Sequence, residues 1–510
     1  MTGSRPKKVI LTIIDSLNPQ ALESCFRRGL VPALQFLKEK GQYYSRCVSV
    51  FPTMTPTATS SIVTGTGPDF HQVPGFVWFN RREKRFINYG ASFGAIWKLG
   101  LPTVIEDLLF NLNIKQLSKK VRTIYEILED HGWSTAAINF YIFRGRNVFE
   151  TKIPLLMQML TRFKLIGRLM GPKLLVLGEL CRPARLFKDA KLWAPVGPFY
   201  KFGVNDEFSG IISSYLIKEG KQPDLMLIYL PDTDSYAHRH KPTEIEESLI
   251  KADRQVARVL NAYGSWDKAL EENVFLVAGD HSQSLVQGGE GSIIDLRALL
   301  AEFRQASLGR LAIQKDIAIC PNERMSYVYI LRWREHRQAA IKQRVIELLR
   351  EDRRIDQIMW KEKSFGLDKY VISRGDSRLW FTRGGGGIDE YGQRWHWEGD
   401  LAAVDGYVEE NSLKLVFRDY PDSFNRISSL LDCSQAGDVV CTAKPGCEFD
   451  GEGAPIHPGT GSHGSLHWED SCVPLIIAGT EQKLEHPRIV DFVPFILKHF
   501  GVELPDYLKR

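Results

Sequence analysis

The sequence predicts an α/β protein in which a doubly wound, mostly parallel sheet carries a smaller α+β insertion. Three observations lead to this prediction. Apolar runs typical of buried strands recur along the chain, helical segments separate them, and polar residues stand directly after several of the runs. Open α/β sheets bind ligands at the carboxyl ends of their parallel strands, so these polar residues also predict the position of the functional site.

The first half of the chain alternates between strands and helices. Residues 8–15 are expected to form a strand, because the run from Val9 to Ile14 is almost entirely apolar and rich in β-branched side chains. The elements expected next are helices at 19–28 and 31–40, a strand at 43–50, a helix at 56–64 that ends at Gly65, helical segments at 104–112 and 121–131, and a strand at 134–140.

The second half begins in the same way and then changes character. A strand at 225–230, an amphipathic helix at 243–263 and a strand at 274–279 continue the alternation. Residues 296–445 form the expected insertion, with short strands at 326–331 and 371–381, a charged helix at 338–350 and a mobile glycine-rich turn at 383–387. The chain then returns to the main sheet. We therefore expect a core made of 1–295 and 446–510, whose last elements are a strand at 473–478 and a helix at 488–500.

Composition excludes several classes of protein. With 510 residues, 44% of them hydrophobic, the chain can bury a large core. The net charge is only +5, from 66 basic and 61 acidic residues, which argues against a dedicated nucleic-acid-binding protein. Eight cysteines without a Cys-x-x-Cys pair indicate neither a zinc knuckle nor a disulfide framework. Because residues 1–8 lack a signal peptide's apolar region, we expect a cytoplasmic protein with reduced thiols.

Residues 152–188 combine many basic side chains with apolar ones. Charges interrupt the apolar residues too often for a transmembrane segment, and none is expected elsewhere. Such a segment could contact an anionic membrane peripherally or guide a lipid substrate. It could equally cover the sheet with a solvated basic edge, and we favour this interpretation.

A candidate nucleophile, Thr55, stands at the start of the helix expected at 56–64. We expect Thr55 to be the N-cap residue and Pro56 the first helical residue. A hydroxyl group there lies beside free backbone N–H groups at the positive end of the helix, which suits a phosphate group. An ordinary threonine N-cap is the competing interpretation. Thr53, Thr57 and Thr59 are alternatives on composition.

Six further residues are candidate metal ligands, each placed after an apolar run or in a glycine-rich segment: Asp15, Asp234, His238, Asp280, His281 and His463. Asp234 and His238 are four residues apart and share one face if the segment is helical. Asp232, His240 and His467 are nearby alternatives. Mixed nitrogen and oxygen ligands suit Zn²⁺ best and Mn²⁺ or Fe second, so we expect two divalent ions, most simply zinc.

Together these residues resemble the alkaline phosphatase superfamily, and within it the type I phosphodiesterase/nucleotide pyrophosphatase family. The resemblance covers about 7–290 and 445–500, and the insertion has no clear counterpart. The segments that carry it are 51–55 (Phe-Pro-Thr-Met-Thr), Thr64-Gly65, 68–71 (Pro-Asp-Phe-His), 231–238 (Pro-Asp-Thr-Asp-Ser-Tyr-Ala-His), 278–282 (Ala-Gly-Asp-His-Ser), 461–464 (Gly-Ser-His-Gly) and 488–494 (Arg-Ile-Val-Asp-Phe-Val-Pro).

The resemblance implies a function. Asp15, Thr55, Asp280 and His281 would hold one metal ion, and Asp234, His238 and His463 the other. Thr55 would be the nucleophile of a hydrolase that cleaves phosphodiester or pyrophosphate bonds through a phospho-threonine. The substrate would be a small phosphoester, such as a nucleotide or a lipid headgroup. The sulfatase branch of the superfamily, which uses a Cys-x-Pro-x-Arg motif for its nucleophile, is disfavoured.

One departure from the family pattern concerns substrate binding. The family usually carries an asparagine about twenty residues after the nucleophile, where this chain has Phe76. Asn80 could replace that asparagine, and Phe76 could form an apolar wall for the substrate or pack under the insertion. The alternatives are therefore a phosphomonoesterase or phosphonate hydrolase of the same superfamily, or a metal-binding protein with weak or no turnover.

Overall fold

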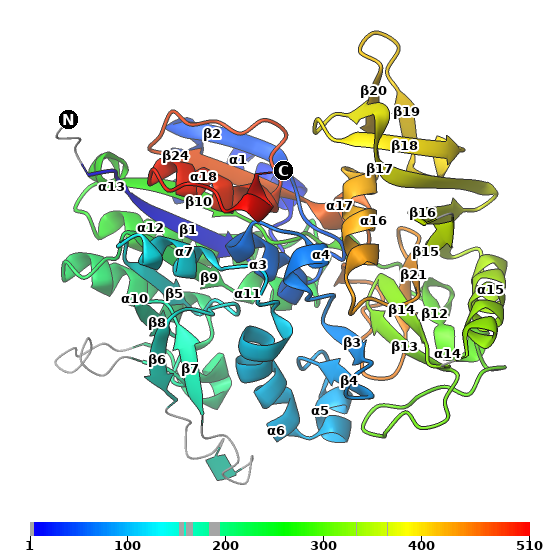
Figure 1. The fold of residues 1–510 in the computed structure, drawn as a ribbon. Coiled ribbons are helices and arrows are strands. Elements are labelled where there is room, and N and C mark those ends of the chain that lie inside the picture. Colours follow the sequence, from blue (N-terminus) through cyan, green and yellow to red (C-terminus); the bar gives the residue numbers. More distant parts are fainter. Residues whose placement is uncertain are drawn as a thin grey trace.

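The computed structural model describes residues 5–151, 158–159, 167–182, 194–332, 334–364 and 366–509. In Figure 1 a central sheet with helices on its faces forms one side of the molecule and a second sheet the other. The central sheet has seven strands in the order β2-β24-β10-β1-β9-β5-β8. Their bounds are β1 (Lys8–Ile14), β2 (Gly41–Val48), β5 (Thr135–Ile138), β8 (Leu174–Val176), β9 (Leu225–Leu230), β10 (Asn273–Ala278) and β24 (Cys472–Ala478).

Strand direction in the central sheet agrees with the predicted fold class. The pairs β10–β1, β1–β9, β9–β5 and β5–β8 are parallel. Only β24 runs the other way, because it pairs antiparallel with both β10 and β2. Parallel strands joined by helices and one antiparallel strand near the edge make a mixed, mostly parallel α/β sheet, which confirms the prediction.

Helices cover both faces of the central sheet (Figure 1). Alternate side chains of β1 show how the faces divide, because successive residues of a strand point to opposite sides. Ile10 and Ile14 pack with α1 (Pro19–Arg27), α2 (Pro32–Glu39), α10 (Asp206–Lys218) and α12 (Glu246–Asn261). Val9, Leu11 and Ile13 pack on the other face with α3 (Thr55–Thr64), α7 (Ile124–Asp130) and α18 (Phe492–His499).

The second sheet is formed by nine strands, and only one of its pairings, β17 with β20, is parallel. The strands are β13 (Ile317–Asn322), β14 (Met325–Ile330), β15 (Ile355–Ser364), β16 (Leu367–Arg374), β17 (Ser377–Asp389), β18 (Arg394–Gly399), β19 (Gly406–Val408), β20 (Lys414–Phe417) and β21 (Val439–Ala443). α15 (Glu335–Glu351) packs on the sheet through an apolar cluster, and α16 (Ser423–Asp432) contacts α4 (Pro68–His71) of the core. The exact boundaries 296–445 stay a prediction.

Smaller elements complete the chain. Residues 77–116 form β3 (Val77–Asn80), β4 (Arg85–Asn88), α5 (Phe93–Leu99), α6 (Leu101–Ile105) and a π-helix, Glu106–Gln116. The remaining short elements are β6 (Asn147–Glu150), β7 (Arg168–Gly171), α11 (Asp232–Ala237), α13 (Trp266–Glu272), β11 (Ser284–Leu285), β12 (Ile293–Asp295), α14 (Leu296–Leu299), β22 (Glu448–Asp450), β23 (Gly461–Ser462) and α17 (Trp468–Ser471).

Two expectations for the insertion were wrong. The expected strand 371–381 is a hairpin of β16 and β17, in which Arg374 pairs with Ser377 and Gly375 has a φ of 56°. A Gly-Asp pair between strands is a turn signal that outweighs the apolar pattern around it. The glycine run 383–387 lies within β17, where the register shifts, and is not a loop. A Cβ on Gly387 would lie 2.1 Å from the ring of Trp397, so glycine lets that ring pack on the strand.

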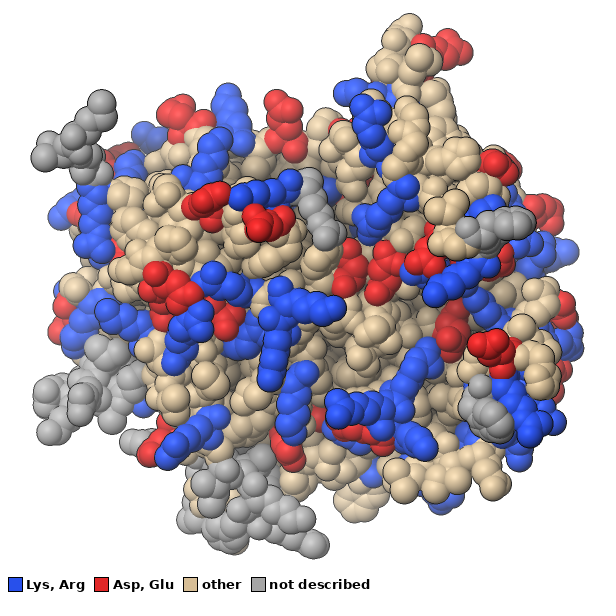
Figure 2. Space-filling model, in the orientation of Figure 1, with Lys and Arg blue, Asp and Glu red and all other residues tan. Residues whose placement is uncertain are grey.

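The surface shows no large area of one charge on the face drawn in Figure 2, where basic and acidic side chains are interspersed. Among the described residues, no helix has the length and apolar character needed to span a membrane. About half of the segment 152–188, for which a peripheral membrane contact is one of the two interpretations, lies outside the described residues.

Candidate active site

Three neighbouring strands bring the first candidate ligands together. β10, β1 and β9 lie side by side and parallel, so Asp280, Asp15 and the helix α11 follow them at the same edge of the sheet. Ser16, in the left-handed region with a φ of 57°, joins the three segments. Its backbone N–H donates to Asp280 Oδ1 (3.2 Å) and its hydroxyl to Asp234 Oδ1 (2.7 Å).

Asp234 and His238 face each other, as their spacing predicts. Asp234 lies in α11 and His238 directly follows this helix, with Nε2 of His238 3.2 Å from Asp234 Oδ1. The two neighbouring alternatives point elsewhere. Asp232 binds Lys201 and the backbone N–H of Asp206, and His240 is exposed and stacks on Tyr236.

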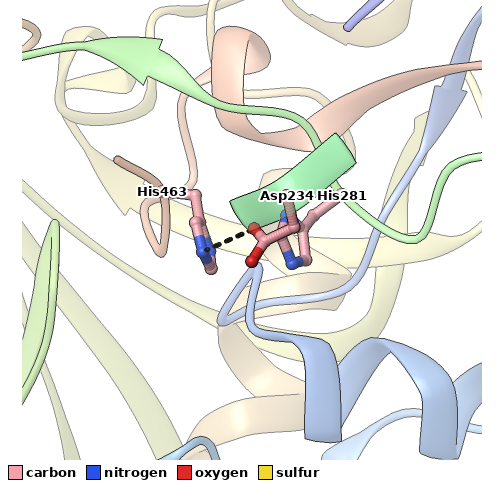
Figure 3. Close-up of side chains that lie close together, drawn as sticks. All are labelled: Asp234, His281 and His463. Carbon is pink, nitrogen blue, oxygen red and sulfur yellow. Dashed lines mark ion pairs between the residues drawn. The ribbon is translucent and has the colours of Figure 1, made fainter. Parts of the chain in front are cut away.

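His463 comes from a loop far along the chain and closes the cluster (Figure 3). Its Nε2 lies 3.9 Å from Asp234 Oδ1, and its ring stacks on that of His281 with centroids 4.0 Å apart. The alternative His467 packs against Tyr420 and caps α17 instead. The structure thus gathers all six candidate ligands of the sequence analysis at one place.

The three histidines are oriented in the same way. Nδ1 of His463 lies 2.7 Å from the carbonyl oxygen of Thr53, Nδ1 of His238 3.0 Å from that of Gly461, and Nδ1 of His281 3.2 Å from that of Ser282. A carbonyl oxygen only accepts hydrogen bonds, so each Nδ1 carries the proton. Each Nε2 points into the cluster, so with a metal ion bound it would be the free nitrogen that a metal-binding histidine requires.

The carboxylates are buried in a way that favours a cation. Asp15 Oδ1 and Asp280 Oδ2 have no hydrogen-bond partner among the described residues. Burial, together with the neighbouring carboxylates of Asp280 and Asp234, raises the pKa of Asp15 well above its usual value. Burial likewise raises the pKa of Asp280 to about 7. Buried acceptors that repel one another without a cation are what a divalent ion would stabilise.

The pKa of Asp234 is shifted in the opposite direction. Burial opposes its ionisation, but the adjacent His238, with His463 and His281, outweighs burial and holds the pKa of Asp234 well below its usual value.

The candidate ligand atoms form three groups, and within each group the atoms lie within 4.8 Å of one another. The groups are Asp15, Asp280 and His281; Asp234, His281 and His463; and His238, Glu323 and His463. Carboxylates and imidazoles at these distances fit a site for two divalent ions.

Thr55 lies at the mouth of this cluster but not as the N-cap. The N-cap residue is Met54, whose backbone is extended, and Thr55 is the first residue of α3. Its hydroxyl turns away from the helix, with Oγ1 3.1 Å from His281 Nε2. The N-cap prediction was therefore wrong, because the side chain is held by the cluster and not by the backbone of α3.

The other threonines of this segment are held away from the cluster. Thr53 Oγ1 donates to Ser465 O (3.1 Å) and accepts from the backbone N–H of Gly464 (2.8 Å). Thr59 Oγ1 donates to the carbonyl oxygen of Thr55 within the helix. Thr57 is fully buried, and its hydroxyl has no hydrogen-bond partner among the described residues. Thr55 is thus the threonine of the four whose hydroxyl faces the candidate ligands.

A cavity of about 520 Å³ opens beside Thr55. Phe76 lines it, together with Asp234, His238 and His463. Asn80 is not among its described lining residues: its side-chain oxygen accepts from the backbone N–H groups of Arg82 and Glu83 in the β3–β4 turn.

Other residues of the cavity were not predicted from the sequence, and those that bear on the site are Asn322, Glu323 and His457. Asn322 and Glu323 lie at the β13–β14 turn of the insertion, and no pattern in the sequence connects that turn with the core. His457 precedes the glycine-rich segment around His463 and stacks on the ring of His238. A histidine six residues before a candidate ligand was the one available signal.

The Cys-x-Pro-x-Arg motif of sulfatases does occur, since residues 181–185 read Cys-Arg-Pro-Ala-Arg. Cys181 is buried, forms a backbone bridge with Leu177 after β8, and is not among the described residues that line the cavity. Burial raises the pKa of its thiol to about 12. The place of Cys181 in the fold argues against a role as nucleophile.

Comparisons with solved structures show relatives of the same fold. Phosphonoacetate hydrolase from Sinorhizobium meliloti, in complex with phosphonoformate, is 17% identical with a TM-score of 0.51, over 97% of this chain and 96% of that one. Human ectonucleotide pyrophosphatase/phosphodiesterase 5 is 11% identical with a TM-score of 0.56, over 98% and 96%. An inactive variant of the murine protein, in complex with AMP, is 10% identical with a TM-score of 0.54, over 98% and 96%.

A search of curated proteins found no significant match to the chain. A family profile does match it, over residues 9–466, and is described as type I phosphodiesterase/nucleotide pyrophosphatase. This match spans the second sheet, every candidate ligand and the strands of the central sheet other than β24, which follows the matched residues. The chain therefore belongs to the type I phosphodiesterase/nucleotide pyrophosphatase family of hydrolases.

Proposed function

We propose that this hydrolase cleaves phosphodiester or pyrophosphate bonds of small phosphoesters, with Thr55 as the nucleophile. The observation that carries the proposal is the position of Thr55 Oγ1, 3.1 Å from His281 Nε2 and on the wall of the cavity that Asp234, His238 and His463 also line. The hydroxyl stands at the positive end of the ten-residue helix α3, whose dipole favours a phosphoryl group there.

Asp15, Thr55, Asp280 and His281 would hold one cation and Asp234, His238 and His463 the other. Zinc is the proposed metal, with Mn²⁺ or Fe as alternatives, and two such ions would lower the pKa of the threonine hydroxyl and neutralise charge on the phosphoryl group. Thr55 Oγ1 would attack phosphorus, forming an O–P bond as the leaving oxygen departs. Water would then break that bond and free the threonine. Two in-line displacements predict retention of configuration at phosphorus.

A phosphomonoesterase or phosphonate hydrolase is the second candidate, and the amide groups of the cavity favour it. Phe76 stands where the family has its asparagine. Asn322 is the only side-chain amide among the described lining residues, and it is already used: Oδ1 accepts from the N–H groups of Phe76 and Val77, and Nδ2 donates to the carbonyl oxygens of Val77 and Cys320. No free amide is left to bind a phosphoryl oxygen.

We also propose a reducing, cytoplasmic location. All eight cysteines are free, and seven of them are buried, which supports this proposal because secreted proteins usually oxidise such thiols. Microscopy of a fluorescent fusion together with cell fractionation tests it. Recovery of the protein outside the cytoplasm would contradict it.

The function is tested by the hydrolysis of bis-p-nitrophenyl phosphate and p-nitrophenyl phosphate by purified, zinc-loaded protein. Thr55→Ala should abolish turnover while the metal content barely changes, and Thr55→Ser, which keeps a hydroxyl, should retain part of it. A diester preferred over the monoester supports the first candidate, and the reverse supports the second. Full activity in Thr55→Ala would reject Thr55 as the nucleophile, and a metal-loaded protein inactive on a broad phosphoester panel would indicate a binding protein.

A further inference from the structure

Glu323 is a carboxylate that the insertion places inside the candidate metal site. It stands with Arg324 in the two-residue turn between β13 and β14, which carries it from the second sheet to the edge of the central sheet. The turn is fixed there, because the backbone N–H of Arg324 donates to the carbonyl oxygen of His463 (2.8 Å). The N–H of Phe449 donates in the same way to the carbonyl oxygen of Glu323 (2.8 Å).

The backbone of Glu323 is strained. Its φ is +59°, in the left-handed region, at the first position of a two-residue hairpin turn, where glycine is the preferred residue. Non-glycine residues in such a conformation gather at functional sites. The conformation therefore makes the Glu323 carboxylate a candidate for a role in the site.

The carboxylate of Glu323 faces the imidazoles of two candidate ligands. Oε1 lies 3.8 Å from Nε2 of His238, and Oε2 lies 3.5 Å from Nε2 of His463. In both rings Nδ1 is bound to a carbonyl oxygen, so Nε2 is the nitrogen that faces the carboxylate. A cation between them would be bound by both Nε2 atoms and by the carboxylate, in place of any proton that they share.

Charge balance points in the same direction. Among the described residues, the ion-pair partners of Asp15, Asp234, Asp280 and Glu323 are all histidines. No Lys or Arg there offsets their charge. Two divalent cations would supply the positive charge that this acidic cluster lacks.

We propose that Glu323 is a fourth protein ligand of the cation held by Asp234, His238 and His463, so that the insertion completes the metal site of the core. The proposal rests on the two-cation site of the proposed function. It assigns the insertion a part in metal binding, beyond any part in selecting the substrate.

The competing explanation is that Glu323 serves only as a hydrogen-bond acceptor. Its Oε2 accepts from the hydroxyl of Ser462 (3.0 Å) and from the backbone N–H of His463 (3.1 Å), and either bond could order the loop of His463. Glu323→Gln separates the two explanations, because the amide oxygen of glutamine can still accept both bonds but the side chain loses its charge.

The experiment is a calorimetric titration of the metal-free full chain with Zn²⁺, for the parent, Glu323→Gln and a control, Glu448→Gln. Glu448 is an equally buried carboxylate that binds the backbone N–H and Nδ1 of His457 and belongs to none of the three ligand groups. We expect two sites in the parent, one of them weakened at least about tenfold in Glu323→Gln and neither changed more than about threefold in Glu448→Gln. The visible spectrum of the Co²⁺-loaded protein should change in Glu323→Gln alone.

Unchanged affinities and Co²⁺ spectrum in Glu323→Gln, or equal losses in both variants, would overturn the proposal. If Glu323→Gln does not fold, Glu323→Asp, which keeps the charge but shortens the side chain, must weaken the same site, and an unaltered site would count against the proposal. A parent that binds two ions without turning over phosphoesters would overturn the proposed function and leave the role of Glu323 intact. A parent that binds no ion would overturn both.

Discussion

Thr53 and His463 bind each other's segments at three points. The carbonyl oxygen of Thr53 accepts from Nδ1 of His463, and its hydroxyl accepts from the N–H of Gly464 and donates to the carbonyl oxygen of Ser465. The segment that leads to Thr55 and the loop of His463 are therefore one unit, although 410 positions separate the two residues.

Thr53→Val should loosen the loop of His463, because the valine keeps the shape but removes both hydroxyl bonds. We expect the affinity for one of two Zn²⁺ ions to fall by about 10-fold to 100-fold, the range for loss of a group that orients a ligand. Thr57→Val in the same segment is the control, since its hydroxyl is buried without a partner and its removal should be neutral or stabilising. Calorimetric titration of both variants measures the effect, and equal affinities would contradict it.

Asp280→Asn should stabilise the metal-free protein at neutral pH. Asp280 has a folded-state pKa of about 7, above its unfolded value, so its contribution to stability is fully present below about pH 4 and is lost as pH rises through about 7. Asparagine does not ionise. The free energy of unfolding of the variant should therefore rise relative to that of the parent as pH rises, by at most about 4 kcal/mol.

Urea unfolding of chelator-treated protein at a series of pH values measures this gain. At saturating Zn²⁺ the parent should become the more stable of the two, because the variant lacks a proposed ligand and the bound ion stabilises the parent by mass action. If the difference in unfolding free energy between variant and parent does not change with pH, Asp280 does not titrate between about pH 4 and 7.

Phe76→Asn should raise diester turnover relative to monoester turnover, because it restores an amide where the family carries one. A single donor to a phosphoryl oxygen contributes up to about 10²-fold to 10³-fold in related chemistry, and we expect at least about tenfold in the ratio of the two kcat/KM values. Asn80→Ala should leave this ratio unchanged, since Asn80 caps the β3–β4 turn. A ratio that stays constant in Phe76→Asn would exclude position 76 from phosphoryl binding.

Arg324→Met should destabilise the protein by about 3–5 kcal/mol, because it leaves a buried charge without its partner. Arg324 Nη1 lies 2.5 Å from Asp470 Oδ1, and both side chains are fully buried between the insertion and the core. The double variant Arg324→Met with Asp470→Leu should recover much of the loss. Urea denaturation of the two single variants and the double variant gives the coupling energy, and additive losses would show that the pair is not coupled.

The middle of the central sheet could be predicted because β1, β9 and β10 are nearly continuous apolar runs followed by glycine, proline or polar residues. β1, β9 and β10 lie within one residue of their expected bounds, and the residues after them met at one edge as parallel strands require. The single antiparallel strand β24 could not be foreseen, since a buried apolar run has the same appearance in either direction.

The site was predictable only as far as local sequence reaches. Asp234 and His238 followed from helical spacing, and Asp280 from its place after β10. Glu323 could not be found, because its contact with His463 spans 140 positions and depends on how two sheets pack. The distinction between Thr55 as N-cap and as first helical residue also depended on a distant partner, His281.

The position of β24 has a consequence for biosynthesis. This strand lies between β10 and β2, and it consists of residues 472–478 near the carboxyl end of the chain. Once the second sheet has been synthesised, all strands of the central sheet except β24 have also been synthesised. At that stage β2 has no neighbour to pair with. His463 is also still missing. The ribosome must therefore deliver residues 472–478 before the core can close, and β2 is exposed to chaperones or to aggregation until then.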